Sequence, residues 1–407
     1  MSMSAQLYVE GAARKSLASK SVMHALLPIM SVVLVGFLII GLALPVLPLH
    51  VAHGLGLSAF VVGLVTGTQF AASLLSRIWA GNYADKKGAK RGVVAGLLAA
   101  QASGLLYLLS IAFTNSPATS VGILLLGRAV LGAAESFIIT GAVSWGLALV
   151  GREGAGRVIA WIGTAMFAAL AIGAPIGTAL YSASGFGAVA LATAVLPFAT
   201  LLLLVRLPAV KPPGTNVKAA FGRVVKAVWL PGIGAALSSI GFGAILAFAS
   251  LLFAQRDWAP VWIGFSAYAV ALVAARLGLG HLPDKLGGAR VALVSALIET
   301  AGLALIWLAP GVLVAGIGAA LTGFGYALVY PALGVEAVRR APPQSRGLVM
   351  GIYTAFLDVA LGFGTPALGL IAGFTELGTV FLVTAILVLS TTAFAVRLLV
   401  APPRERS

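Results

Sequence analysis

The sequence predicts an all-α membrane protein with twelve transmembrane helices arranged as two pseudo-symmetric halves of six. Three observations support this prediction: a very apolar composition, twelve apolar runs long enough to cross a bilayer, and a small charged segment that occurs twice. Of the 407 residues, 60% are hydrophobic and 9% are charged, whereas soluble domains have about 25% charged residues. A water-soluble protein could not cover its surface with so few polar groups, so we expect a membrane protein.

Apolar runs of about 20 residues can cross the hydrocarbon layer as helices. Along the chain we place spans at residues 24–49, 58–79, 92–113, 119–149, 157–181, 186–206, 229–253, 260–281, 291–309, 311–337, 348–371 and 377–400. Turn residues separate them, as in "HGLGLS", "TNSPAT" and "SASGFG". The first run is too long for the core of a cleaved signal peptide, which has about 7–15 apolar residues, so we predict that it is the first span.

The longest polar stretch lies in the middle of the chain and predicts the boundary between the halves. It runs from Arg206 to Lys226 and contains a Pro-Pro-Gly sequence among several charges. We therefore predict five parts: a cytoplasmic segment at 1–23, a first half at 24–206, a linker at 207–228, a second half at 229–400 and a tail at 401–407.

The distribution of Lys and Arg predicts the orientation, because these residues are enriched in cytoplasmic loops. Of the 26 Lys and Arg, Arg256 falls on the outer side if the N-terminus is inside, and Arg77, Arg128 and Arg276 fall within spans. The other 22 collect on the cytoplasmic side with both termini. The formal net charge of +15 is thus explained by topology, and we expect no nucleic-acid partner.

An internal repeat relates the two halves. The segments "GNYADKKGAKR" (Gly81–Arg91) and "GHLPDKLGGAR" (Gly280–Arg290) share glycine, aspartate and lysine positions, and begin 280 − 81 = 199 residues apart. Arg77 and Arg276 keep this separation. One difference in loop length would explain why later pairs are 191 residues apart: Gly132 with Gly323, Gly156 with Gly347, Gly173 with Gly364, and Pro175 with Pro366. Such duplication is typical of secondary transporters, which move one half against the other.

The repeated segments resemble the signature of the major facilitator superfamily, G-x-x-x-D-[RK]-x-G-x-[RK]-[RK]. The first copy matches throughout, and the second is weaker at its basic end. The resemblance implies a latch in which Asp85 meets the N-terminus of the eleventh span (348–371), and Asp284 that of the fifth span (157–181), when the cytoplasmic side is closed. The predicted gate residues are Gly81, Asp85, Lys86, Gly88, Arg91, Gly280, Asp284, Gly287, Arg290, Arg77 and Arg276.

The glycines of the two copies carry separate expectations. We expect Gly88 and Gly287 to adopt the positive φ that a short turn needs. We expect Gly81 and Gly280 to allow the close approach of a neighbouring helix.

Two further motifs extend the resemblance. The fourth span contains "LLLGRAVLG" (Leu124–Gly132), which is similar to the family's L-x-x-x-R-x-x-x-G element. The fifth contains "AIGAPIGTAL", in which Gly173, Pro175 and Gly177 resemble the antiporter motif of exporters, although Ala174 and Thr178 depart from it. Stretches such as "GRVIAWIGT" and "YTAFLDVALG" resemble the bacterial YhhS-like efflux branch, which is linked to phosphonate tolerance. The resemblance implies a bacterial inner-membrane location.

Ionisable groups within spans are costly and usually functional. We select Asp358, Glu135 and Arg128 as candidates for proton coupling. Glu135 follows Arg128 by seven residues, about two helical turns, so both point to the same side. Simpler roles stay open: Arg128 could bond backbone carbonyls of the first span, and Glu135 could only neutralise Arg128 or lie close enough to the cytoplasm to be hydrated. Asp358 has no cation within its own helix.

Candidate substrate contacts come from polar and aromatic residues of spans that line or flank the centre of this fold. They are Arg128, Gln69, Trp145, Trp161, Tyr326, Tyr330, Tyr353 and Glu299. Membrane Trp and Tyr more often anchor the protein at the interface, and Glu299 could face lipid or a neighbouring helix. These alternatives remain open.

The sequence predicts a transporter rather than an enzyme. It has no H-E-x-x-H, no G-x-x-x-x-G-K-[ST] and no cysteine, so we expect no metal, no cofactor and no direct use of ATP. We expect a monomer that moves a small organic solute by alternating access, with proton-coupled efflux of a drug, phosphonate or metabolite favoured. An importer or uncoupled facilitator of a sugar or organic acid, or a non-transporting sensor, remains an alternative.

Overall fold

The computed structural model describes residues 26–150, 155–204, 209, 221–340 and 346–400, and every regular element in these residues is a helix. The predicted segments at 1–23 and 401–407, and most of the linker at 207–228, lie outside the described residues. The first span, Leu26–Gly54, ends in a short helix α2 (Val46–Leu49) and a π-helical turn η1 (His50–Gly54).

The remaining helices follow in chain order. They are α3 (Ala59–Lys87), α4 (Ala89–Ile111), α5 (Pro117–Val150), α6 (Ala155–Ser184), α7 (Phe186–Leu204), α8 (Phe221–Gln255), α9 (Ile263–Leu279), α10 (Leu282–Leu286), α11 (Gly288–Leu308), α12 (Val312–Arg340), α13 (Arg346–Phe374) and α14 (Leu377–Val400).

Twelve of the described helices can account for the predicted spans. Among the described residues, ten helices are long and apolar enough to cross a membrane, and shorter apolar stretches occupy α7 and α9. Large apolar side chains also point outward, as at Leu75 (70% exposed) and Leu313 (74% exposed). An apolar outer surface is suited to lipid, and the all-α membrane architecture is confirmed.

Helices extend beyond the apolar runs that predicted them. Helix α3 continues to Lys87 rather than ending near residue 79, and α8 begins at Phe221 rather than at residue 229. Polar residues at a helix end are compatible with helical backbone in water, whereas hydropathy detects only the part that suits the hydrocarbon. Gly81 and Asp85, predicted in a loop, therefore lie in the last turns of α3.

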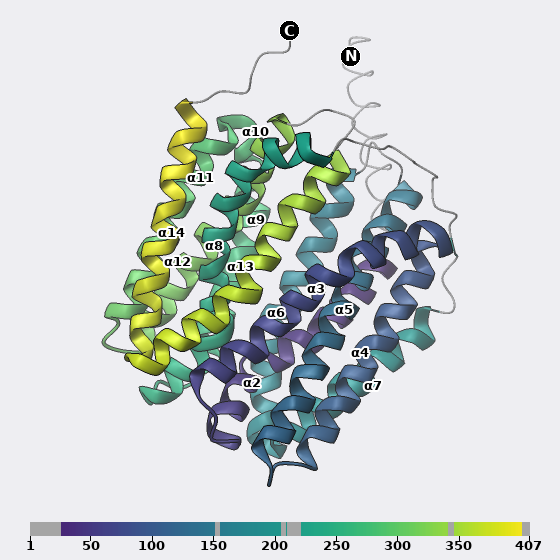
Figure 1. Cartoon of the computed structure of the whole chain (residues 1–407), viewed down its shortest axis with the longest axis vertical. Coiled ribbons are helices and arrows are strands. Elements are labelled where there is room, and N and C mark those ends of the chain that lie inside the picture. Colours follow the sequence, from purple (N-terminus) through teal and green to yellow (C-terminus); the bar gives the residue numbers. More distant parts are fainter. Residues whose placement is uncertain (1–25, 151–154, 205–208, 210–220, 341–345, 401–407) are drawn as a thin grey trace, which may run out of the picture.

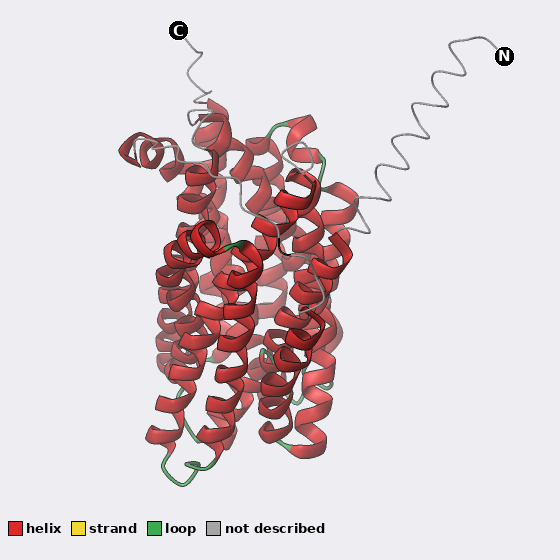
Figure 2. Cartoon of the chain, turned by 90° about the vertical axis from the view of Figure 1, so that its right-hand side faces the viewer, coloured by secondary structure: helices red, strands yellow, loops and turns green. Residues whose placement is uncertain are grey.

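The helices form two bundles that stand side by side (Figure 1). In the first half, α4 packs against α5 and α7, and α3 packs against α5; in the second, α11 packs against α12 and α14. The long helices run roughly along the long axis of the molecule (Figure 2). The halves meet where α3 packs on α13 and α6 packs on α9.

Equivalent close contacts support the internal repeat. A Cβ on Gly132 would overlap the backbone oxygen of Gln69, and a Cβ on Gly323 would overlap that of Tyr268. Gln69 and Tyr268 are 268 − 69 = 199 residues apart, and the two glycines are 323 − 132 = 191 apart. The two offsets that relate the motifs in sequence thus also relate tight helix contacts in space.

We call the end of the bundle with α10 and the C-terminal end of α14 the basic end, and the other the opposite end (Figure 1). The halves touch toward the opposite end. There the Thr365 hydroxyl of α13 donates to the backbone oxygen of Gly63 in α3 at 3.0 Å, and the Ser266 hydroxyl of α9 donates to that of Ala171 in α6 at 3.4 Å.

At the basic end the repeated segments form glycine turns. Gly88 has φ 98° and Gly287 has φ 92°, so the expected positive φ is confirmed at both. Asp85 and Asp284 are exposed, and neither forms an ion pair with another described residue. In Figure 1 the ends of α3 and α13 lie apart here.

The expected close helix approach at Gly81 and Gly280 is wrong for this structure. A Cβ on Gly81 would meet nothing within 4 Å, and one on Gly280 would meet only its own segment, at Arg276. No described helix packs against either glycine, and the ends of α3 and α13 lie apart at this end (Figure 1).

Candidate functional site

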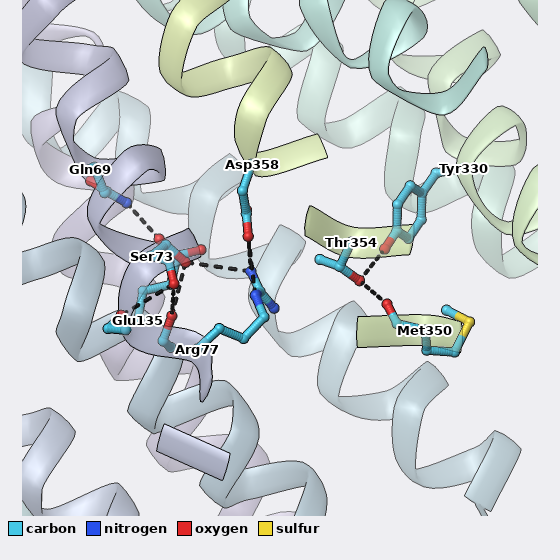
Figure 3. A network of polar contacts seen from close by, with 10 residues as sticks. Gln69, Ser73, Arg77, Glu135, Tyr330, Met350, Thr354 and Asp358 are labelled. Carbon is cyan, nitrogen blue, oxygen red and sulfur yellow. Dashed lines mark hydrogen bonds and ion pairs between the residues drawn. The ribbon is translucent and has the colours of Figure 1, made fainter. Parts of the chain in front are cut away.

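An ion pair joins the two halves deep within the bundle. Arg77 of α3 donates to Oδ2 of Asp358 in α13, from Nη2 at 2.6 Å and from Nε at 3.0 Å. The Arg77 side chain is 26% exposed and that of Asp358 is 3% exposed. Figure 3 shows the two side chains reaching toward each other from their helices. The sequence placed Arg77 in the gate and Asp358 in proton coupling, and the structure brings the two groups together.

The pair continues into a polar network on the first half (Figure 3). Arg77 Nη2 also lies 3.4 Å from the Ser73 hydroxyl, and that hydroxyl is 3.0 Å from the hydroxyl of Ser136 in α5. Gln69 Nε2 donates to Glu135 Oε2 at 2.7 Å. Because Gln69, Ser73 and Arg77 are spaced by four residues, they lie on one face of α3. That spacing was the available signal for Ser73, which sequence reasoning missed together with Ser136.

Arg128 is separate from Glu135. It is 1% exposed, its Nε donates to the backbone oxygen of Val65 at 3.2 Å, and its Nη1 is buried without a partner. Among the described residues Glu135 makes no direct ion pair with it, so the alternative in which Glu135 neutralises Arg128 through space stays open. Seven helical residues rise about 10 Å, too far for these two groups to meet. Arg128 bonds a carbonyl, but of α3 rather than of the first span.

Glu299 lies within the second half. It is fully buried, with 0% exposure, and accepts a hydrogen bond from the Ser238 hydroxyl of α8 at 2.6 Å. Its Oε1 is buried without a partner and faces Gly241. Glu299 therefore faces a neighbouring helix of its own half rather than the interface between the halves.

The tyrosine candidates gather in the second half. Tyr353 donates to the backbone oxygen of Tyr330 at 2.6 Å, and the Tyr330 and Thr354 hydroxyls are 2.8 Å apart. Thr354 lies one turn before Asp358 on α13, so Tyr330 is close to the ion pair (Figure 3). Tyr326 lies 3.3 Å from the Ser239 hydroxyl.

The two tryptophan candidates differ from the tyrosines. Trp145 is buried with its Nε1 unpartnered, and Trp161 is partly buried. In the described part of the chain, neither side chain forms a hydrogen bond or cation–π contact with the Arg77–Asp358 pair.

The glycine-rich motif of α6 packs this helix on the first span. A Cβ on Gly173 would meet Gly41, and a Cβ on Gly177 would overlap the backbone of Leu42. Pro175 lies between them inside α6. Small residues let helix backbones approach closely, so the motif fixes how α6 sits within its own half.

Comparisons with known proteins agree with this architecture. The family model described as Major Facilitator Superfamily matches residues 29–290 and 232–407. An uncharacterized MFS-type transporter of Salmonella typhimurium is 41% identical over 370 residues, which cover 91% of this chain and 95% of that protein. A second, of Burkholderia mallei, is 42% identical over 361 residues, 88% of each chain.

Two solved structures share the fold. The D-xylose-proton symporter has a TM-score of 0.75 at 14% identity, over 94% of this chain and 99% of that one. The nucleoside transporter NupG has a TM-score of 0.74 at 15% identity, over 91% and 99%. From the duplicated bundle, the family match and the relatives together, the chain belongs to the major facilitator superfamily, a family of secondary transporters and not of enzymes.

Proposed function

We propose that this transporter exports a small organic solute in exchange for protons, by alternating access. The Arg77–Asp358 ion pair is the observation that carries the proposal, because it joins the two halves within the spans. A proton on Asp358 removes the negative charge that holds Arg77. Proton binding and the cross-half ion pair therefore compete for one carboxylate.

The surroundings of Asp358 support this competition. Its side chain is 3% exposed, and a charge so far from water needs a partner. Either the Arg77 guanidinium or a proton can supply that compensation. Glu135, whose carboxylate accepts from the neutral Gln69 amide, is the second candidate proton site.

The contacts between the halves support alternating access. They hold the opposite end together through Gly63 with Thr365 and Ala171 with Ser266, while Asp85 and Asp284 stand exposed at the basic end. The distribution of Lys and Arg predicts that the basic end is cytoplasmic. We therefore propose that this state faces the cytoplasm, with both latches released.

A tolerance assay tests the proposal in bacteria stripped of their own efflux pumps. Cells would express the wild type, Asp358→Asn or Asp85→Asn at equal levels and be challenged with toxic phosphonates, sugars, dyes and antibiotics. We expect the wild type to protect and both variants to lose protection. Asp257→Asn is the matched control, because Asp257 is an exposed loop residue with φ 54°, a conformation that asparagine tolerates.

Each outcome separates the alternatives. Unchanged protection in Asp358→Asn would refute the role of this carboxylate and favour an uncoupled facilitator. Sensitisation of cells by the wild type would refute export and favour an importer. Loss of protection in Asp85→Asn alone would support the role of Asp85 in the latch and refute a role of Asp358 in the mechanism.

A further inference from the structure

Arg276 is the counterpart of Arg77 in the second half. The two arginines are 276 − 77 = 199 residues apart, the offset that also relates Gln69 to Tyr268. The position equivalent to Asp358 lies 191 residues earlier, at 358 − 191 = 167, and is Phe167. The Arg276 guanidinium carbon lies 4.7 Å from the centroid of the Phe167 ring. The same cross-half contact therefore exists twice, once with a carboxylate and once with an aromatic ring.

Neighbouring contacts confirm that this register is real. In one interface a Cβ on Gly67 of α3 would meet the backbone oxygen of Gly362 in α13. The equivalent positions in the other interface are Ser266 and Ala171, where the serine hydroxyl donates to the Ala171 oxygen at 3.4 Å. The α6–α9 interface thus repeats the α3–α13 interface but lacks its carboxylate.

The charge of Arg276 has no counter-ion among the described residues. It makes no ion pair and no hydrogen bond there, and its Nε is buried without a partner. The Phe167 ring attracts the cation but cannot neutralise it, so the partly buried guanidinium lacks a counter-charge in the described part of the chain. Tyr268, Tyr326 and Tyr330 lie near Arg276 as neutral phenols and supply no counter-charge. Glu299 is engaged instead with Ser238.

We propose that Arg276 binds the carboxylate of the transported solute, and that this solute is an organic acid with an aromatic or otherwise apolar body. This inference rests on the proposed transport function and adds its substrate class. A guanidinium can hold a carboxylate through two parallel N–H···O bonds. The rings near Arg276 suit an apolar body: Phe167 faces the guanidinium, and the nearby Tyr268 and Tyr326 each stack with Phe242 at 5.6 Å.

The test is ligand binding to the purified full-length protein in lipid nanodiscs. The probes are benzoate, phenylacetate and cinnamate, each paired with its neutral amide, and the readouts are the thermal midpoint and the Kd. We expect the acids, but not the amides, to raise the midpoint. Arg276→Gln should weaken acid binding by at least about tenfold, as loss of a charge-assisted contact predicts. Arg256→Gln is the matched control, because Arg256 is an exposed loop arginine that also lies over a ring, that of Trp258, at 5.7 Å.

A second variant keeps the test decisive if Arg276→Gln folds poorly. Phe167→Asp would place a carboxylate where the equivalent interface has Asp358, so it should pair with Arg276 and abolish acid binding in folded protein. Phe167→Leu removes the ring without adding charge and should keep discrimination between acid and amide. Equal stabilisation by acids and amides, no stabilisation by any acid, or wild-type affinity in both Arg276→Gln and Phe167→Asp would overturn the proposal.

The binding assay and the tolerance assay distinguish failure of the substrate proposal from failure of the transport proposal. Loss of protection in Asp358→Asn with unchanged acid binding in the Arg276 and Phe167 variants would keep proton-coupled export and reject Arg276 as the substrate residue. Loss of acid binding in those variants with full protection in Asp358→Asn would keep the anion site and reject the coupling carboxylate.

Discussion

Asp358 and Glu299 show that the burial of a carboxylate does not by itself indicate its role. Both are almost completely removed from solvent. Asp358 is held by an arginine from the other half, whereas Glu299 accepts a serine hydroxyl from a helix of its own half. A change of charge at Asp358 therefore acts on the contact between the halves, and a change at Glu299 acts within one bundle.

The Arg77–Asp358 pair should show strong coupling in a double-mutant cycle. Arg77→Gln leaves Asp358 either to take up a proton or to remain charged without a partner, and the second state costs up to about 3–5 kcal/mol for a buried pair. We therefore expect a fall in the thermal midpoint of the purified protein at pH values where Asp358 is ionised. The double variant Arg77→Gln/Asp358→Asn removes both charges and should recover much of that loss. Purely additive effects of the two changes would mean that the pair contributes no interaction energy.

Glu299→Gln should differ from Asp358→Asn in its effect on transport. Glutamine keeps the volume of Glu299 and can still accept the Ser238 hydrogen bond, so we expect protection in the tolerance assay to stay within about twofold of wild type. Glu299→Ala should instead lower the thermal midpoint, because it leaves a cavity and an unpaired hydroxyl. Loss of protection in a well-folded Glu299→Gln would show that this carboxylate takes part in transport.

Individual helices show which structural features can be predicted from the sequence and which cannot. Hydropathy located twelve spans, and the glycine spacing located the turns at Gly88 and Gly287, because these signals depend on local sequence and backbone conformation. Hydropathy missed the last turns of α3, which are polar but helical. Helical periodicity put Arg128 and Glu135 on one side but could not supply their partners.

The partners are not predictable from the sequence because they depend on how helices cross. Arg77 and Asp358 meet across 281 residues of chain, and their register is set by the contact of α3 with α13. No local sequence signal marks Phe167, because its significance depends on its position opposite Arg276.

The tight glycine contacts in α5 and α12 should be equally sensitive, since the repeat makes them equivalent. Gly132→Ala and Gly323→Ala each put a Cβ into the backbone of the adjoining helix, and overpacking of this kind costs about 1–3 kcal/mol. We expect both to lower the thermal midpoint and the yield of folded protein.

Two other glycines in the same helices serve as controls. Gly122 in α5 and Gly316 in α12 have nothing within 4 Å of an added Cβ, so alanine there should be neutral or stabilise the helix by up to about 1 kcal/mol. If all four substitutions behave alike, the close approach of the helices does not limit stability.

The whole molecule has two cross-half interfaces that share a register but differ in chemistry. The α3–α13 interface closes an ion pair within the protein, and the α6–α9 interface leaves an arginine against a ring. Equivalent positions of the two halves can therefore have different roles. In our proposals, Arg77 is released when Asp358 binds a proton, and Arg276 binds an anionic solute. The duplication provides equivalent arginine positions in the two halves. The residue opposite each arginine, Asp358 or Phe167, then determines its proposed role.

Alternating access requires the halves to separate at the opposite end, and a disulfide can test this directly. The chain contains no cysteine, so introduced thiols have no native competitors. A Cβ on Gly362 would lie 3.3 Å from the Cβ of Ala71, close to the spacing of about 3.5–4.5 Å found in disulfides. The double variant Ala71→Cys/Gly362→Cys should therefore cross-link under mild oxidation, with the loss of free thiols measured by maleimide labelling.

The cross-linked protein should lose transport and regain it on reduction, because the bond holds α3 and α13 together where the proposed cycle must part them. The single variants, and the pair Leu75→Cys/Gly362→Cys with one thiol on the outward face at Leu75, should not cross-link and should transport equally with and without oxidant. A cross-linked protein that still transports at the wild-type rate would mean that the halves need not separate at this level. The Arg77–Asp358 pair on the same interface would then be a permanent structural contact rather than one that breaks when a proton binds.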